Sequence, residues 1–344
     1  MHALLHSHSP LRIFAGSGIA TVGVLAAVLW TLGIDAAVVT LILMAVEIAF
    51  SFDNAIINAK ILAKLSKVWQ DIFLTVGMVV AVLGMRVVFP ILIVAITAHL
   101  SWNDVLNLAL HHPDEYSHRL EAAHPSIAAF GGSFLLMLAL HFFLDGQRKI
   151  LWLKQLERQL QNIARVWMPA ALSALIVVAI TLVPANHHPR TTLTAGLLGI
   201  ITYLAVHALS AGLDKTNRKN YKVQALTGMA ALWSFVYLEV LDASFSFDGV
   251  IGAFAITSKV VLIAAGLGVG ALWVRSLTVF MVRRGTLANY IYLEHGAHYT
   301  VAVLAFVMLV SVFFEVPDAL AGVAGIGLLG ASALASRQAL LHSR

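Results

Sequence analysis

The sequence predicts an all-α, polytopic membrane protein of about ten transmembrane helices with an inverted-topology internal repeat. Three observations lead to this fold class. The 344 residues are 60% hydrophobic and only 11% charged, whereas soluble domains are roughly 25% charged. Apolar segments long enough to cross a bilayer recur along the whole chain. A short acidic motif also occurs twice, once in each half of the chain.

Hydropathy gives ten apolar segments, whose boundaries are accurate to about four residues. In chain order they are 13–32, 35–58, 71–98, 126–146, 167–184, 192–213, 224–256, 259–282, 297–316 and 319–336. The first is too long for the apolar part of a cleaved signal peptide, so we expect an uncleaved span. The third, seventh and eighth are long, so we expect tilts, kinks or breaks in them.

The loops between these segments alternate in Lys and Arg content, which predicts their orientation. One side holds 17 of the 22 basic residues, and the other holds only Arg119, Arg190 and Lys259. The remaining two, Arg86 and Arg275, fall inside apolar segments. The positive-inside rule places the basic side in the cytoplasm. Ten spans then place both termini there.

Two connections are longer than the others. Residues 99–125, on the outer side, carry His99, His111, His112, His118 and His124 among acidic residues. This segment is either a solvated amphipathic loop or a vestibule that attracts metal ions. Residues 147–166 mix Trp152 and leucines with basic residues, which predicts an amphipathic segment on the cytoplasmic membrane surface. It joins two halves, residues 1–165 and 166–344.

The repeated motif places acids inside hydrophobic segments. Residues 47–54 read Glu-Ile-Ala-Phe-Ser-Phe-Asp-Asn, and residues 242–249 read Asp-Ala-Ser-Phe-Ser-Phe-Asp-Gly. Each has a carboxylate six residues before the Asp of Phe-Ser-Phe-Asp. Burying an acid in the membrane costs about 2.5–3.5 kcal/mol on insertion scales, so such acids persist mainly for function.

Other features recur in the same order in the two halves. They are Gly77 and Gly266, each nine residues before an arginine (Arg86 and Arg275), and the acids Asp145 and Glu315 that follow a Phe-Phe pair. The two motif helices are the second and the seventh spans, five positions apart in the series, and this odd offset makes them run antiparallel. This is the inverted repeat of many transporters, whose site lies near the midplane at the repeat interface.

Helical spacing leaves two possibilities for the first motif. Positions six apart differ by about 240° around a helix, so Glu47 and Asp53 do not share a face of a straight helix. Either the helix faces two neighbours or it breaks near Ser51-Phe52. A break would free backbone carbonyls that, with carboxylates, suit a hard cation. In the second copy Gly249 replaces Asn54, which favours a local unwinding there as well.

The candidate metal ligands supply oxygen atoms, with no cysteine in the chain. They are Glu47, Asp53, Asn54, Glu239, Asp242 and Asp248, with Ser51, Ser246, Arg86 and Arg275 in support. Oxygen ligands favour Mn²⁺, Ca²⁺ or Mg²⁺ over Cu⁺ or Zn²⁺. The arginines either pair with an acid, to neutralise it when metal is absent or to serve as the counter-charge in a coupled exchange, or extend to a membrane surface, which Arg275 is near enough to reach.

Several other polar residues receive weaker assignments. Asp145, Glu294, His295 and Glu315 lie at span ends and are candidates for a gate or an access point for metal. His141 and His207 lie in apolar spans, where an interhelical hydrogen bond is the expected role. Gly266, Gly268 and Gly270 are expected to allow close helix packing, because a phosphate loop does not occur inside a membrane span.

The paired acidic motifs resemble those of the TerC family of integral membrane proteins, and in particular its bacterial TerC-related branch. The resemblance covers most of residues 35–316. It implies a location in the bacterial inner membrane and metal-ion export, because several TerC relatives are described as manganese exporters. The wider superfamily includes LysE-type exporters and cation/proton exchangers. The site residues that it carries over are Glu47, Asp53, Asn54, Asp242 and Asp248.

The expected function is therefore a secondary transporter that exports a divalent cation, with Mn²⁺ preferred, through a buried acidic site at the repeat interface. No ATP-binding motif is present, so a proton or sodium gradient would drive it. The expected partners are the bilayer and the transported cation, without nucleic acid or a tightly bound cofactor; a homo-oligomer is compatible with the sequence. The alternatives are a non-transporting component of a tellurium or metal stress-resistance complex and a transporter of another small solute.

An enzyme is not expected. Intramembrane aspartyl proteases also pair Asp residues on neighbouring helices, but they need a Gly-x-Gly-Asp motif before one of them. Both candidate aspartates here, Asp53 and Asp248, follow Ser-Phe instead.

Overall fold

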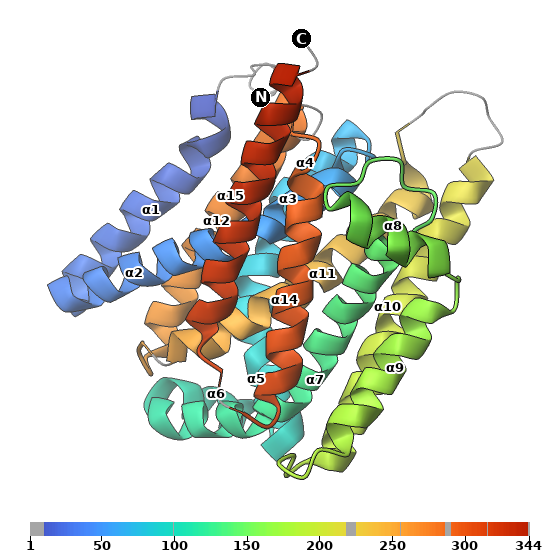
Figure 1. Cartoon of the computed structure of the whole chain (residues 1–344). Coiled ribbons are helices and arrows are strands. Elements are labelled where there is room, and N and C mark those ends of the chain that lie inside the picture. Colours follow the sequence, from blue (N-terminus) through green and yellow to red (C-terminus); the bar gives the residue numbers. More distant parts are fainter. Residues whose placement is uncertain are drawn as a thin grey trace. The chain divides into compact units, whose positions relative to one another are not determined.

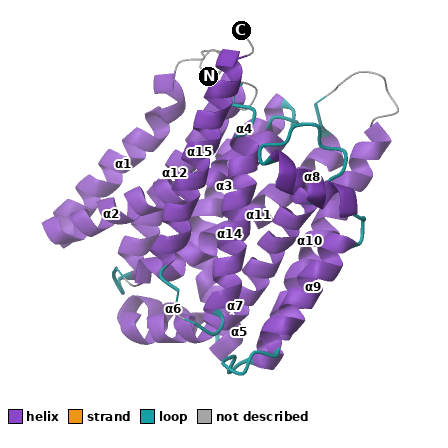
Figure 2. Ribbon diagram, viewed as in Figure 1, coloured by secondary structure: helices purple, strands orange, loops and turns teal. Residues whose placement is uncertain are grey.

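The computed structural model of the chain describes residues 10–98, 100–217, 225–254, 256–285, 290–314 and 316–342. Within these residues the chain consists of helices and loops, and the only bridge is an isolated parallel one between Leu65 and Leu226 (Figure 2). The all-α prediction is thereby confirmed.

The helices are distributed along the whole described chain (Figure 1). They are α1 (Pro10–Leu32), α2 (Ile34–Phe50), α3 (Phe52–Leu62), α4 (Lys67–Val79), the π-helix η2 (Val80–Val88), α5 (Phe89–Ala98), α6 (Trp102–His111), α7 (Pro113–Phe143), α8 (Lys154–Ile163), α9 (Met168–Thr181), α10 (Pro189–Asn217), α11 (Gly228–Phe254), α12 (Val260–Arg284), α14 (Leu293–Ser311) and α15 (Asp318–His342).

The described helices support a multi-pass membrane protein. Seven helices are long and apolar enough to cross a bilayer. The number of candidate spans rises to nine if each of two bent helix pairs is counted as one span. Each of the ten segments expected from hydropathy is helical over most of its described residues, and these residues supply seven to nine candidate spans. The segment 224–256 forms α11, which is not among the candidates found in the described residues. The short α9 qualifies only together with α8, from which it is bent by 98°.

The outer connection differs from the loop expected over residues 99–125. Helix α6 and the first turns of α7 occupy it, and Ser101 caps α6 by accepting a hydrogen bond from the amide of Asp104. The expectation was wrong because a capped, amphipathic ten-residue helix has no long apolar run to mark it. Among the described residues no three His, Asp or Glu side chains of this region group into a metal site. His99 lies outside the described residues.

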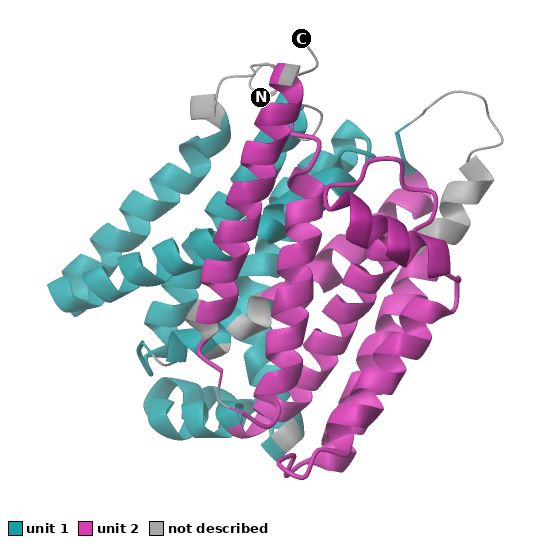
Figure 3. Cartoon of the chain, viewed as in Figure 1, with its two compact units in different colours: residues 1–121, 225–227, 249–287 teal, residues 122–224, 228–248, 288–344 magenta. Residues whose placement is uncertain are grey.

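The chain divides into two compact units, coloured separately in Figure 3. Unit 1 comprises residues 1–121, 225–227 and 249–287, and unit 2 comprises residues 122–224, 228–248 and 288–344. Helices α7 and α11 contribute residues to both units. The units are thus interleaved along the sequence, and the two-half inverted repeat remains a prediction.

Unit 1 is built around helix α12, which packs along α1, α2, α3 and η2. Helices α1 and α2 are joined at Gly33, whose φ of 87° lies in the left-handed region that glycine adopts easily. Val28, Ala36 and Leu262 form a buried apolar cluster that joins α1, α2 and α12. These contacts fix α2, which carries the first acidic motif.

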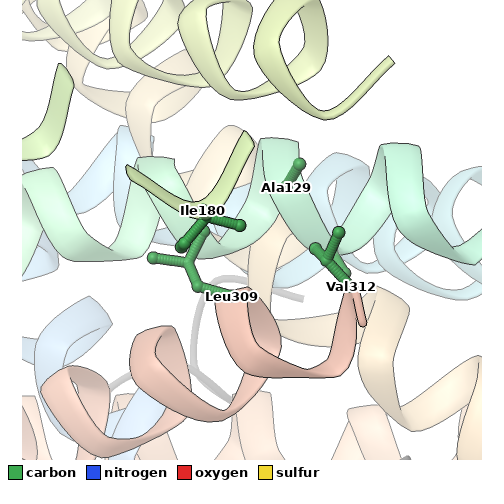
Figure 4. Packing of buried hydrophobic residues seen from close by; sticks show 5 residues of the cluster. Ala129, Ile180, Leu309 and Val312 are labelled. Carbon is green, nitrogen blue, oxygen red and sulfur yellow. The ribbon is translucent and has the colours of Figure 1, made fainter. Parts of the chain in front are cut away.

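Unit 2 has its own apolar core. Ala129, Ile180, Leu309 and Val312 meet in a buried cluster that brings together α7, α9 and α14 (Figure 4). Glycines allow close approach here as well, since a Cβ added at Gly132 would lie 2.8 Å from Leu309 Cγ. Helix α15 packs along α14. The cluster therefore packs α14 against α7, and α15 in turn packs on α14.

Candidate functional site

The first acidic motif lies at a break between two helices. Helix α2 ends at Phe50, α3 begins at Phe52, and the two helices are bent by 54°. Ser51 between them has φ −97° and ψ 14°, outside the regular helical range. Of the two alternatives that the sequence left open, the structure shows the break near Ser51-Phe52. It brings the C-terminal turn of α2 next to the N-terminal turn of α3, where backbone groups lack helical partners.

Glu47, in the last turn of α2, forms a buried ion pair with Arg86 of η2. The two residues are 4% and 3% exposed, and Arg86 Nη2 donates a short hydrogen bond to Glu47 Oε1. The Ser51 hydroxyl donates to the same oxygen over 3.2 Å. Arg86 Nη1 also donates to the carbonyl of Ala81 at 2.9 Å. Of the two roles expected for Arg86, the structure places it in the neutralising one.

Arg86 lies in the π-helix η2, where the backbone departs from the hydrogen-bond pattern of an α-helix. Helices α4, η2 and α5 run on as one long segment, within which residues Val80–Val88 take the wider turn. Single-turn π-bulges are frequent at functional sites, where they re-aim a side chain. The sequence predicted a tilt, kink or break in this long segment and did not specify the change of helix type that the structure shows.

Glycines of α12 let Glu47 sit directly against that helix. A Cβ added at Gly270 would lie 2.6 Å from both Cβ and Cγ of Glu47, and one at Gly266 would lie 2.5 Å from Leu43 Cβ. Neither position has room for a side chain. At Gly268 the added atom would lie 3.0 Å from Val82 of η2. The expectation that these glycines serve close packing is confirmed.

Helix α11 also passes the Glu47 carboxylate. A Cβ added at Gly249 would lie 3.4 Å from Glu47 Oε2, which is ordinary van der Waals distance. The second acidic motif thus contributes its Gly249 to the surroundings of the first.

Asp53 opens α3 and is buried, with 2% exposure. Its carboxylate accepts hydrogen bonds from the backbone amides of Asn54 and of Asp53 itself. A helix N-terminus favours an anion at this position, because its amide groups point outward and the helix dipole is positive there. Within the described residues Asp53 forms no ion pair.

Two amide side chains extend this polar region along α3. Asn54 and Asn58 are four residues apart, so they lie on one face of the helix, and both are buried. Among the described residues Asn58 Oδ1 has no hydrogen-bond partner. A buried amide oxygen without a partner is costly. Asn58 therefore joins the candidate ligands, and the sequence analysis missed it because it lies outside the repeated motif.

Arg275 differs from the surface-reaching role considered for it. The side chain is buried, and Nη1 donates to the backbone carbonyl of Phe73 at 3.0 Å. Its guanidinium also lies 4.3 Å from the centre of the Phe73 ring. Arg275 thus ties α12 to α4 inside unit 1.

The second acidic motif lies on an unbroken helix. Glu239 and Asp242 of α11 are both buried in unit 2. The unwinding expected at Gly249 is absent, because α11 runs continuously from Gly228 to Phe254. Gly249 is not among the described glycines with positive φ, so the helix uses it as an ordinary helical residue. The side chains of Ser246 and Asp248 lie outside the described residues.

The residues considered for a gate lie in different settings. Asp145 is exposed after the end of α7, and its Oδ1 accepts a hydrogen bond from the amide of Gln147 at 2.9 Å. Glu294 is partly buried in the first turn of α14. His295 is only 2% exposed, and its Nε2 lies 2.9 Å from the carbonyl oxygen of Ile150. Glu315 lies outside the described residues.

His295 belongs to a buried charged cluster that the sequence analysis did not predict. Glu157 of α8 is fully buried, and its Oε2 lies 3.4 Å from His295 Nε2 and 3.5 Å from Arg148 Nη2. Burial lowers the pKa of Arg148, and the neighbouring Glu157 carboxylate opposes that shift. The guanidinium rests on the ring of Phe142, 3.8 Å from its centre. The cluster thus holds α8 and the loop before it against α14.

The described residues contain no group of three or more His, Asp or Glu side chains that could hold a metal ion by themselves. Residues 47–58, which flank the helix break in unit 1, carry several side-chain oxygen donors. They are the carboxylates of Glu47 and Asp53, the hydroxyl of Ser51 and the amides of Asn54 and Asn58. Such oxygen ligands suit hard divalent cations.

Comparisons with known proteins place the chain in a family. No curated protein and no solved structure matches it. The family model described as "Protein of unknown function (DUF475)" matches residues 52–340, a range that contains Asp53, Arg86 and the whole second motif but begins after Glu47. The resemblance to TerC proteins is not confirmed by this match. Because the match covers most of its length, the chain belongs to the DUF475 family.

Proposed function

We propose that the chain is a secondary transporter that exports a divalent metal cation, with Mn²⁺ as the preferred substrate, in exchange for protons or sodium ions. One observation carries the proposal. Glu47 and Asp53 are buried on the two sides of a helix break within a candidate membrane span. Transporters commonly bind ions where a membrane helix is interrupted, because side chains and helix ends there can both serve as ligands.

The cost of burial supports a functional role for these acids. Each acid in the membrane costs about 2.5–3.5 kcal/mol on insertion scales. Arg86 compensates Glu47, whereas Asp53 forms no ion pair among the described residues and relies on backbone amides of α3. A bound dication would supply the charge that Asp53 lacks.

Arg86 suggests how the site could alternate between two states. The guanidinium holds the same Glu47 oxygen that accepts the Ser51 hydroxyl. A cation that takes Glu47 as a ligand must displace Arg86, so the arginine stands in for the cation when the site is free of metal. Leaving either charge of a buried pair alone is strongly unfavourable. Exchange of one positive charge for another keeps the carboxylate compensated in both states.

The resemblance of the motifs to TerC proteins favours export and manganese within the DUF475 family. The buried Glu239 and Asp242 of α11 are the second group of carboxylates in this proposal. A site made of oxygen donors without thiolate also suits Ca²⁺ and Mg²⁺. The transport of these two ions is therefore compared with that of Mn²⁺.

Transport by the purified chain in liposomes tests the proposal. We expect uptake of ⁵⁴Mn²⁺ driven by an imposed proton or sodium gradient, with Ca²⁺ and Mg²⁺ compared as competitors. Glu47→Gln and Asp53→Asn should each abolish it. Asp35→Asn is the matched control, because Asp35 is an exposed acid in the first turn of the same helix α2.

Two results would reject the proposal. One is uptake by the wild-type chain no faster than by empty liposomes for every cation tested. The other is unchanged uptake by both Glu47→Gln and Asp53→Asn. A scaffold of a stress-resistance complex would give the first result, with variants that differ only in stability.

A further inference from the structure

Two histidines from separate helices meet inside unit 2. His141 lies in the last turn of α7 and His207 lies on α10, and their ring centres are 4.3 Å apart with planes tilted by 56°. Both side chains are partly buried. The two rings contact each other across the helices, whereas the hydrogen bond expected for them stays a prediction. At this separation the protonation of one ring affects that of the other.

The surroundings of the pair are aromatic and acidic. Tyr203 of α10 stacks on His207 with ring centres 5.6 Å apart, and its ring centre is 6.0 Å from that of His141. The hydroxyl of Tyr203 shares a hydrogen bond with that of Tyr237 on α11. Asp145, four residues after His141, interacts with it electrostatically. The groups that face the pair from α7, α10 and α11 thus include one carboxylate and two phenols.

Burial opposes a positive charge on His141, and Asp145 offsets part of that cost for a single proton. A proton on either ring is stabilised by the neutral imidazole beside it, which can accept a hydrogen bond, and by Asp145. A second proton would place two like charges side by side away from bulk water. Interacting groups of this kind titrate as one coupled system.

We propose that His141 and His207 form a site that binds a single proton, and that this proton is the ion exchanged for the metal cation. Binding adds one proton from water to a ring nitrogen, and release returns it to water, with no change in oxidation state. The second part of the proposal rests on the proposed transport function; the single-proton site does not.

Histidine-selective ¹⁵N NMR of the full chain in lipid nanodiscs tests the proton site directly. In a pH titration of the wild type we expect the two rings to take up protons in two steps separated by more than about one pH unit. In His207→Phe, His141 should titrate in one step, and in His141→Phe the same should hold for His207. His124→Gln, a change of another α7 histidine that contacts Ser311, should leave both curves unchanged.

Independent titration of the two wild-type rings would overturn the single-proton site, and this result needs no variant to fold. An unchanged His141 curve in a folded His207→Phe protein would overturn it as well.

The coupling is tested in liposomes by comparing two modes of ⁵⁴Mn²⁺ movement. His207→Phe should retain exchange of Mn²⁺ for Mn²⁺ and lose uptake driven by a pH gradient. If pH-driven uptake continues at the wild-type rate, the pair does not carry the exchanged proton, although the transport function stands. If the wild type moves no cation in either mode, the transport function itself fails, and the NMR result is unaffected.

Discussion

At the scale of single residues, the Glu47–Arg86 pair is the feature on which the rest depends. Both side chains are almost completely buried, and each has further polar partners, Ser51 for the acid and the Ala81 carbonyl for the arginine. Removing one member of such a pair leaves an uncompensated buried charge. The free energy of unfolding should therefore respond to the balance of charge rather than to either residue alone.

A double-mutant cycle measures this balance. Arg86→Gln should lower the free energy of unfolding by about 3–5 kcal/mol, as is usual when one partner of a buried ion pair is removed. The double variant Glu47→Gln/Arg86→Gln should recover a large part of that loss, because no lone charge remains. Denaturant-induced unfolding in mixed micelles gives the values. Additive effects of the two substitutions would show that the pair is not coupled.

At the scale of helices, the site depends on how closely α12 approaches α2. The glycines at 266 and 270 face α2, and Gly268 faces η2. Because helices in a membrane gain little from the hydrophobic effect between them, close backbone packing at small residues holds them together. The position of Glu47 is thus set by a helix more than 200 residues later in the chain.

Gly270→Ala should disturb this packing. The added methyl group would lie 2.6 Å from Glu47 Cβ and 3.2 Å from the carbonyl oxygen of Met44, so α2 must move. We expect a loss of about 1–3 kcal/mol, typical of overpacking. The control is Gly23→Ala on α1, where an added Cβ meets nothing within 4 Å. Thermal unfolding in detergent distinguishes the two; equal melting temperatures would contradict the close approach.

The linker helix α8 depends on a single buried acid. Glu157 accepts hydrogen bonds from the Leu153 amide and the Tyr299 hydroxyl, both at 3.2 Å, and compensates Arg148. Glu157→Gln should release α8, at a cost of about 3 kcal/mol, and increase hydrogen exchange over residues 154–163. Arg158→Gln, an exposed change on the same helix, should not. Equal exchange in the two variants would mean that Glu157 does not fasten α8.

The elements show what sequence patterns can and cannot predict. The six-residue spacing of Glu47 and Asp53 limited the first motif to two possibilities, one of which was the break at Ser51, because helical periodicity is a local property. The partner of Arg86, the π-helix around it and the burial of Glu157 did not follow. These depend on contacts between residues far apart in sequence. Gly249 was misjudged because glycine permits unwinding in a helix without requiring it.

At the scale of the whole molecule, the described helices make the chain a multi-pass membrane protein of the DUF475 family. Orientation is the part of this description that remains a prediction. It comes from 17 basic residues assigned to one side among the 22 in the chain, which the positive-inside rule places in the cytoplasm together with both termini.

Single cysteines can test the orientation, because the chain has none of its own. Lys64→Cys and Lys154→Cys should react with a membrane-impermeant maleimide only after the membrane is permeabilised. Asp114→Cys and Arg190→Cys should react in intact cells. All four positions are exposed in the structure. Labelling of Lys64→Cys and Lys154→Cys from opposite sides would contradict the predicted topology.

The central claim is that the buried acids at the α2–α3 break bind the transported cation. Equilibrium binding of Mn²⁺ to the purified chain, followed by the loss of the free-ion electron paramagnetic resonance signal, tests it most directly. We predict saturable binding by the wild type and by Asp35→Asn, and loss of that binding in Asp53→Asn. Binding by Asp53→Asn as tight as that of the wild type would contradict the claim.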